Sequence, residues 1–214
     1  MINPEIIVAL DVPNKKLMEQ TLDRMPNSIK WYKIGLELFC SEGPEILSSL
    51  KNREKSIFLD LKLHDIPRTV SNAVKTASEH GVDLMTVHAI GGRAMLEEAA
   101  LAAKSFSASP KIVAVTTLTS LNEKDFNDLG LFRSVEEQAV ALGELAIQSG
   151  IDGLVTSAHE AKTLRSAFPN SILVTPGIRM PSGDLGDQKR VATPSYAVEQ
   201  GSTYLVVGRP IVQS

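Results

Sequence analysis

Eight short apolar runs, each rich in β-branched residues, alternate with segments whose apolar residues follow helical spacing. Parallel neighbouring strands need a crossover connection, which is usually a helix, so this alternation predicts a parallel sheet. Eight repeats within 214 residues favour one closed (β/α)₈ TIM barrel of class α/β, a single domain over residues 1–214. An open, doubly wound sheet is the alternative. The predicted strands are residues 6–11, 29–35, 56–62, 84–89, 111–119, 153–157, 171–175 and 203–207.

The clearest predicted helix follows the third strand. Apolar residues recur at i, i+3, i+4 and i+7 over residues 70–77, and Gly81 is a suitable C-terminal stop. Ser134 and Glu137 form a capping-box pattern that begins another helix, which ends near Gly150. Other helical patterns cover residues 17–25, 44–51, 96–103 and 161–168.

The end of the chain leaves little room for a further helix. Ser214 comes four residues after Pro210, just beyond the eighth predicted strand. We therefore expect the barrel's final helix to be absent from this chain, or the last strand to be covered by something else.

Composition argues against several classes of partner. The formal net charge of −3 gives no basic surface for nucleic acid or an anionic membrane. No apolar run approaches the roughly 18 residues that span a bilayer, and the start, MINPEIIVALDVP, does not resemble a signal peptide. Cys40 is the single cysteine, which suits a reducing cytoplasm. The four histidines lack metal-ligand spacing, so we expect no metal site.

Charged residues crowd the end of the third predicted strand, in the stretch FLDLKLHDIP at 58–67. Asp60 and Lys62 are two positions apart, so a strand directs both to one face. An unpaired buried charge would cost several kcal/mol or more. Pairing offsets that cost, and Asp11, Lys33 and Asp65 can join the two in a mutually compensating array.

Each of these residues has a structural alternative. Asp60 and Lys62 can form an ion pair that only stabilises the barrel mouth. Asp65 can be the N-cap of the following helix, Asp11 can serve turn chemistry, and Lys33 can extend to solvent. These alternatives do not explain why the residues occur together at successive strand ends, where barrel enzymes carry their chemistry.

Arginines follow the seventh and eighth predicted strands. In barrels these two loops frequently bind phosphate through backbone N–H groups and a cation. Arg179 follows the seventh strand, and Gly208 with Arg209 follows the eighth. We expect an anionic group to bind there, whereas the alternative for the Gly-Arg-Pro sequence is a surface turn.

Taken together, these residues resemble the orotidine 5′-monophosphate decarboxylase family over essentially the whole chain. The pieces that carry the resemblance are Asp60-x-Lys62-x-x-Asp65, Leu10-Asp11, Lys33-Ile34-Gly35, Val87-His88-Ala89 with Gly91-Gly92, Leu118-Thr119-Ser120, Pro176-Gly177-Ile178-Arg179, Gly186-Asp187-Gln188-x-Arg190 and Val207-Gly208-Arg209-Pro210.

The resemblance implies a homodimeric barrel that converts orotidine 5′-monophosphate to uridine 5′-monophosphate and CO₂ in de novo pyrimidine synthesis, without metal or organic cofactor. By position, Lys62 resembles the proton donor, and Asp60 resembles the carboxylate near the substrate carboxylate. Lys33 belongs to the same network. Asp65 and Thr69 would reach the active site of the partner subunit.

The resemblance also implies how the nucleotide is bound. Asp11 with Lys33 would hold the ribose hydroxyls, and Thr119 would contact the pyrimidine. Gln188 would bridge phosphate and base. The phosphate itself would bind Arg209 and the Gly208 backbone. Arg179 lies in the region that would close over the ligand, and the loop at 180–188 is the predicted lid.

Three rival functions stay open. A Mg²⁺-dependent 3-keto-L-gulonate 6-phosphate decarboxylase or hexulose-phosphate synthase shares the Asp-x-Lys-x-x-Asp pattern, although the motif at 186–190 and Leu118-Thr119 argue against it. A Schiff-base aldolase would use Lys62 as its nucleophile. A binding protein would keep the phosphate-ligand pocket without turnover.

Overall fold

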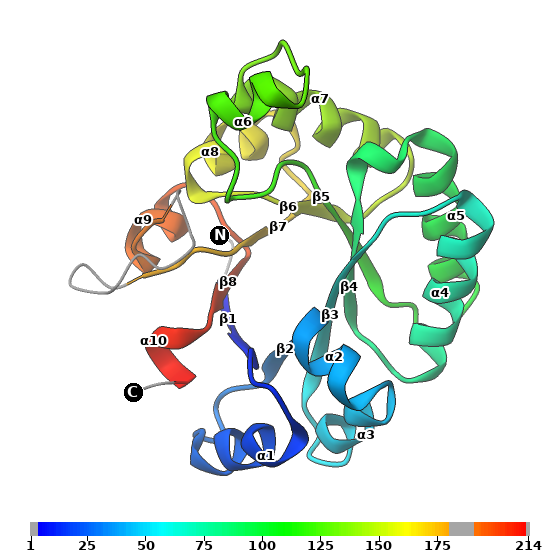
Figure 1. Cartoon of the computed structure of the whole chain (residues 1–214), viewed down its shortest axis with the longest axis vertical. Coiled ribbons are helices and arrows are strands. Elements are labelled where there is room, and N and C mark those ends of the chain that lie inside the picture. Colours follow the sequence, from blue (N-terminus) through cyan, green and yellow to red (C-terminus); the bar gives the residue numbers. More distant parts are fainter. Residues whose placement is uncertain (1–3, 180–190, 213–214) are drawn as a thin grey trace.

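Eight parallel strands close into a barrel in chain order, β1-β2-β3-β4-β5-β6-β7-β8 (Figure 1). The computed structural model describes residues 4–179 and 191–212. The closed barrel confirms the predicted fold class. The strands are β1 (Glu5–Ala9), β2 (Trp31–Gly35), β3 (Ser56–Leu63), β4 (Leu84–His88), β5 (Lys111–Val115), β6 (Gly153–Val155), β7 (Ile172–Thr175) and β8 (Tyr204–Val207).

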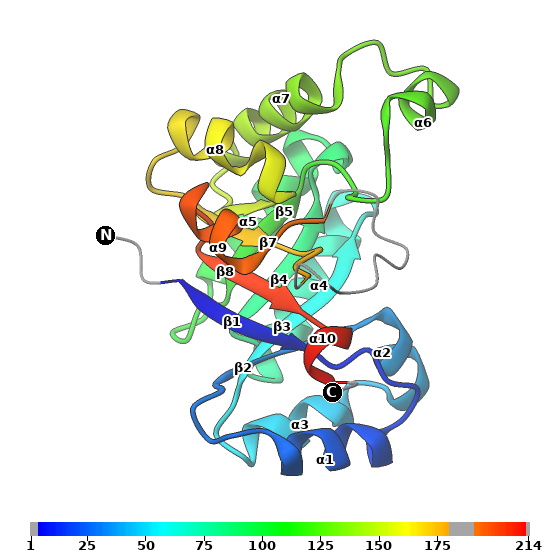
Figure 2. The same cartoon turned by 90° about the vertical axis from the view of Figure 1, so that its left-hand side faces the viewer.

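Helices surround the outside of the barrel (Figures 1 and 2). Every predicted helical segment contains a helix. The short elements α2, α6, α9 and α10 were not predicted, because four to seven residues often show no clear helical period. The helices are α1 (Lys15–Arg24), α2 (Leu36–Glu42), α3 (Glu45–Lys51), α4 (Pro67–Glu79), the 3₁₀ helix η1 (Ala89–Gly91), α5 (Arg93–Lys104), α6 (Glu123–Asp128), α7 (Val135–Gln148), α8 (Ala158–Ala167), α9 (Pro194–Glu199) and α10 (Arg209–Val212).

The apolar core has two shells, as strand alternation requires. In β1 and the residue after it, Ile7 and Ala9 belong to the cluster that fills the barrel, whereas Val8 and Leu10 pack in the shell between sheet and helices. Both faces of the strands are therefore buried, and their sequences read as continuous apolar runs. Polar residues that follow a strand consequently lie at the rim of a packed barrel.

Four strands, β1, β4, β5 and β6, end earlier than predicted. β5 ends at Val115, not at residue 119, because its neighbour β6 has only three residues. The last ladder contact comes from the amide of Thr116, which donates to the Val155 carbonyl at 3.3 Å. β1 likewise ends at Ala9. Asp11 and Thr119 therefore lie on loops beyond the strand ends.

The last strand is followed by the four-residue helix α10. Ile211 and Val212 of α10 pack against the shell between sheet and helices, and Arg24 of α1 donates to the Val212 carbonyl at 3.3 Å. Figure 2 shows α10 beside β1. In the described part of the chain, this short helix occupies the place after β8. No helix in that part is long and apolar enough to cross a membrane.

Candidate active site

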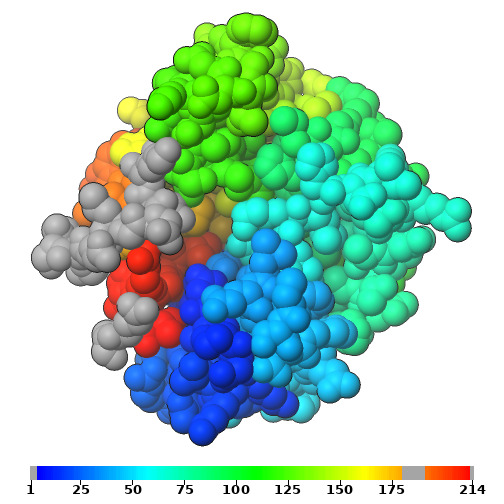
Figure 3. Space-filling model, viewed as in Figure 1, coloured from blue at the N-terminus to red at the C-terminus, as the bar shows by residue number. Residues whose placement is uncertain are grey.

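The strands end around a cavity of about 500 Å³ at one mouth of the barrel. Figure 3 looks onto this face, which is hollowed between the blue N-terminal, cyan and red C-terminal segments. Apolar side chains from the barrel interior, among them Phe58, Val155 and Val206, form part of the cavity lining. The predicted site residues that line it are Asp11, Lys33, Asp60, Lys62, Thr119, Arg179, Gly208 and Arg209.

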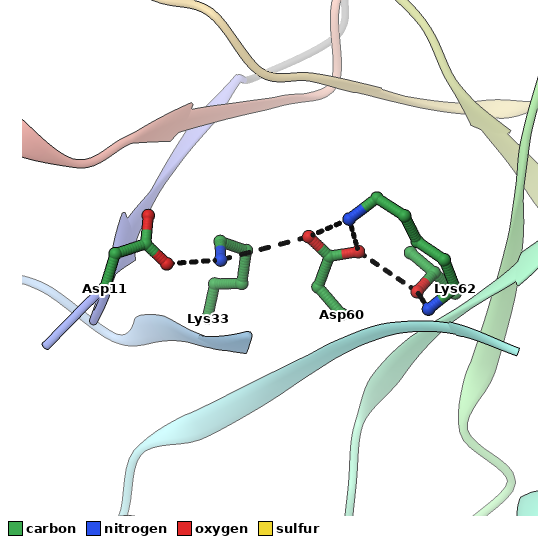
Figure 4. Close-up of polar contacts among 5 residues, drawn as sticks. Asp11, Lys33, Asp60 and Lys62 are labelled. Atoms are coloured by element: carbon green, nitrogen blue, oxygen red, sulfur yellow. Dashed lines mark hydrogen bonds and ion pairs between the residues drawn. The ribbon is translucent and has the colours of Figure 1, made fainter. Parts of the chain in front are cut away.

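Four of these side chains form a row of alternating charge across β1, β2 and β3 (Figure 4). The Lys33 ammonium donates to Asp11 Oδ1 at 2.8 Å and lies 3.9 Å from Asp60 Oδ2. On the other side, Lys62 Nζ lies 2.9 Å from Asp60 Oδ1 and 3.0 Å from Asp60 Oδ2. The row sums to zero charge. Each charge in it lies next to a charge of opposite sign, which offsets the cost of burial.

The position of Lys33 rules out one alternative. The residue is 8% exposed and its ammonium is held by Asp11, so it does not extend to solvent. Gly35, also at the end of β2, makes room for this ion pair. A Cβ at Gly35 would lie 2.8 Å from Lys33 Nζ and 3.3 Å from Asp11 Oδ1. A side chain at position 35 would collide with the Lys33–Asp11 ion pair, which explains why this position is a glycine.

Arginine side chains lie on the side of β1 that faces away from β2 and β3. Arg179 follows β7, and Gly208 with Arg209 follows β8; all three line the cavity. Around the barrel the charged residues of the cavity therefore run from β7 through β8, β1 and β2 to β3. A ligand held there can place an anionic group near the arginines and a reacting group near Lys62.

Comparison with known proteins agrees with this arrangement. The sequence profile of the orotidine 5′-phosphate decarboxylase / HUMPS family matches residues 4–214. The chain belongs to this family.

Similar proteins cover nearly the whole chain. A protein of Idiomarina loihiensis named orotidine 5′-phosphate decarboxylase is 43% identical over 212 residues, which are 99% of this chain and 92% of that protein. One of the same name from Gloeothece citriformis is 46% identical over 213 residues, or 99% and 91% of the two chains. The crystal structure of orotidine 5′-phosphate decarboxylase from Lactobacillus acidophilus has a TM-score of 0.87 and 35% identity, and covers 99% of this chain and 93% of that one.

Asp65 and Thr69 lie apart from the cavity of this member of the family. Among the predicted site residues that the structure describes, these two are exposed and do not line the cavity. The N-cap interpretation of Asp65 is wrong: Pro67 occupies the first turn of α4, and the N-cap is Ile66. The Asp65 carboxylate instead accepts a hydrogen bond from the Ile66 amide at 2.6 Å.

Strand β3 is irregular at the segment that carries Asp60 and Lys62. The register between β3 and β4 shifts between Leu59 and Leu63, and Lys62 has a left-handed φ of 51°, which is uncommon for a residue with a side chain. Asp60 and Lys62 do share a face, as predicted. A bulge, however, and not regular alternation alone, sets the final direction of Lys62.

Two further observations concern ligands. Gln188 and the rest of the predicted lid at 180–188 lie outside the described residues. Arg179, which immediately precedes the lid, is described. Within the described ranges, His, Cys, Asp and Glu side chains nowhere gather in a group of three that could hold a metal ion.

The His88 imidazole predicts a pH dependence of stability. Burial lowers the pKa of His88 below 6.5, and nearby His64 and Lys62 lower it further; the His64 ring stacks on it at 5.6 Å. Around pH 6.5 the unfolded chain then binds a proton that the folded chain does not. The free energy of unfolding should fall as the pH drops through about 6.5 towards the folded pKa.

Urea unfolding at pH 7.5 and pH 5.5 measures this effect. The decrease should be smaller in His88→Asn, which keeps an acceptor for the Ile90 amide now bound to His88 Nδ1. His159→Asn is the control, because His159 is exposed. Equal pH dependence in His88→Asn and wild type would contradict the prediction.

Proposed function

We propose that this protein removes CO₂ from orotidine 5′-monophosphate to give uridine 5′-monophosphate in pyrimidine biosynthesis, as a single (β/α)₈ domain acting in the cytoplasm. The observation that carries the proposal is the Asp60–Lys62 pair in a cavity whose other side holds Arg179 and Arg209. The names of the relatives at 43% and 46% identity support it. The family description also includes HUMPS, and the names of these relatives favour the orotidylate reaction within the family.

The proposed chemistry needs a cation where charge develops. When the bond between C6 and the carboxylate breaks, its electron pair stays on C6 and CO₂ leaves. The pyrimidine ring delocalises that pair poorly, so an ammonium group beside C6 lowers the barrier. The same ammonium can transfer its proton to C6, after which water reprotonates the lysine. We assign both roles to Lys62 and propose that no cofactor takes part.

Asp60 has two proposed roles. Its carboxylate holds the Lys62 ammonium through both oxygens, which orients the proton donor before substrate binds. It would also lie near the substrate carboxylate. The row of Asp11, Lys33, Asp60 and Lys62 is neutral, so the substrate carboxylate adds one negative charge beside Asp60. When neutral CO₂ leaves, that charge stays on C6 and moves away from Asp60 towards the Lys62 ammonium. We rank this ground-state effect below stabilisation of the transition state by Lys62.

The remaining residues would bind the nucleotide. We propose that Arg209 and the Gly208 backbone hold the phosphate, with Arg179 nearby. Asp11 and Lys33 would hold the ribose hydroxyls, and Thr119, which is 9% exposed, would contact the pyrimidine. Gln188 would bridge phosphate and base. Because the phosphate is remote from C6, its binding energy can position the reacting carbon.

We further propose a homodimer in which Asp65 and Thr69 complete the partner's cavity. Their exposure outside their own cavity supports this assignment. Ile66, between them in sequence, is 67% exposed, and a large apolar side chain there suits a subunit interface. Each stretch at 58–69 would then serve two active sites.

Mixing two inactive variants tests the shared site. In a hybrid dimer of Lys62→Ala with Asp65→Asn, one cavity has both changes and the other has neither. Random mixing should therefore restore about a quarter of wild-type activity, since half of the dimers are hybrids with one intact site of two. The variants are unfolded together, refolded and assayed for CO₂ release.

The matched control replaces either partner by the double variant Lys62→Ala/Asp65→Asn, which leaves no intact cavity in any dimer. Activity should then stay at background. Hybrid dimers that form without recovering activity would show that Asp65 does not act across an interface.

The function itself is tested by the loss of orotidylate absorbance in EDTA. The proposal expects full activity there. Activity that disappears in EDTA and returns with Mg²⁺ would favour the metal-dependent rival. Borohydride trapping of substrate on Lys62 would favour the aldolase. Binding without any CO₂ release would indicate a phosphate-ligand binding protein.

A further inference from the structure

Thr86 lies opposite the irregular segment of β3. Leu59 pairs with Met85 and Leu63 with Val87, so the three residues at 60–62 face the single residue Thr86 on β4. Regular pairing would place one residue opposite one, so the segment cannot form a complete backbone ladder with β4. The Thr86 side chain, which is 0% exposed, is buried at this gap.

The Thr86 hydroxyl makes two hydrogen bonds whose directions are fixed. The Lys62 amide donates to Thr86 Oγ1 at 2.8 Å. A hydroxyl has one proton, and Thr86 directs it to Asp60 Oδ1 at 3.1 Å. The carboxylate can only accept, and the amide can only donate. Thr86 therefore connects the backbone of Lys62 to the carboxylate that holds the Lys62 ammonium.

These bonds close a ring around the lysine. Asp60 Oδ1 accepts from both the Thr86 hydroxyl and Lys62 Nζ, while Thr86 Oγ1 accepts from the Lys62 amide. The left-handed backbone of Lys62 is costly and persists only where its surroundings hold it. The hydroxyl supplies a partner for the amide that the bulge removes from regular pairing.

We propose that Thr86 is a positioning residue: its hydroxyl fixes the bulge in β3 and thereby the placement of the Lys62 ammonium. Thr86 does not line the cavity, so it acts through Asp60 and Lys62. The consequence for turnover rests on the function proposed above. The consequence for the Lys62 backbone does not, and the two can be measured separately.

Two substitutions separate the hydroxyl from the volume of the side chain. Thr86→Val keeps the branched shape and removes both hydrogen bonds, whereas Thr86→Ser keeps the hydroxyl and loses a methyl group. Thr21→Val is the matched control. Thr21 is also buried, at 2% exposure, and its hydroxyl donates to the Leu17 carbonyl in α1, outside the cavity lining.

Steady-state kinetics on orotidine 5′-monophosphate is the first measurement. Thr86→Val should lower kcat about 10- to 100-fold, the effect of losing hydrogen bonds to a charged group and its neighbour. KM should change by less than about threefold, because the nucleotide contacts remain. Thr86→Ser and Thr21→Val should retain kcat within about threefold of wild type.

Amide hydrogen exchange at Lys62, followed by NMR, is the second measurement and needs no turnover. The Lys62 amide should exchange at least about tenfold faster in Thr86→Val than in wild type, and slowly in Thr86→Ser. If Thr86→Val does not fold, Thr86→Cys takes its place, since a thiol is of similar size and a weak hydrogen-bonding group.

Unchanged kcat and unchanged Lys62 exchange in the valine variant would overturn the proposal, as would an equal loss of kcat in Thr21→Val. Fast exchange with unchanged kcat would overturn the positioning role. If the wild type releases no CO₂, the proposed function fails, and the exchange data alone decide whether Thr86 holds the Lys62 backbone.

Discussion

Replacing Lys62 by alanine is expected to reduce CO₂ release from orotidine 5′-monophosphate by at least about 10⁴-fold while the barrel still folds. General acid catalysis contributes about 10²- to 10⁴-fold and a preorganised charge about 10²- to 10³-fold, and this one ammonium would supply both. Because Lys62 would act on charge that develops only in the transition state, the effect should fall mainly on kcat. An absorbance assay measures the loss of turnover, and circular dichroism of the same sample measures whether the barrel is folded.

Lys111→Ala is the matched control for this variant. Lys111 also pairs with a carboxylate, at 2.9 Å from Asp152 Oδ1, but it lies at the beginning of β5, at the opposite end of the barrel. Its activity should equal that of wild type within experimental error. Near-normal turnover in Lys62→Ala would overturn the assignment of Lys62 as the proton donor.

The second large effect is expected from Arg209→Ala. If Arg209 binds the phosphate, its loss should reduce kcat/KM about 10²- to 10³-fold, the range for a charge-assisted contact whose energy also positions the substrate. Substrate lacking the phosphate provides an internal comparison. With the nucleoside orotidine as substrate, the same variant should lose little activity, since orotidine has no phosphate for Arg209 to bind.

Arg53→Ala is the control for loss of an arginine, because Arg53 pairs with Glu19 and Asp23 on the surface of α1, away from the cavity lining. It should leave kcat/KM unchanged. An equal loss on nucleotide and nucleoside in Arg209→Ala would contradict the phosphate assignment, as would unchanged kcat and KM.

Much of the fold follows from local patterns. Apolar runs that alternate with helical spacing can bury both faces of each strand only in a sheet covered by helices, and eight such units closed into a barrel. Strand ends were predicted less well, because a strand stops where its neighbour stops. The end of β5 at Val115 depends on β6, some 40 residues later.

The site shows the same division. Charges at successive strand ends predicted the row from Asp11 to Lys62, since parallel strands bring their carboxyl ends to one rim. Thr86 was missed, because one threonine within an apolar strand resembles core and the bulge opposite it leaves no sequence signal. The N-cap alternative for Asp65 was wrong, because Pro67 begins α4 and Ile66 is its N-cap.

The cavity is built partly from residues that follow β1 and partly from residues that follow β8. β1 pairs with β8, so Asp11 and Gly208 come from opposite ends of the sequence and meet at the seam where the barrel closes. A chain emerging from the ribosome with seven strands formed has the row of charges but lacks the arginine that follows β8. If the nucleotide binds as proposed, binding requires β8 to be docked against β1, and bound ligand would in turn stabilise the closed seam. A barrel that opens between β1 and β8 would separate Asp11 from Gly208 and Arg209, so opening at this seam alone would divide the proposed ribose contacts from the proposed phosphate contacts.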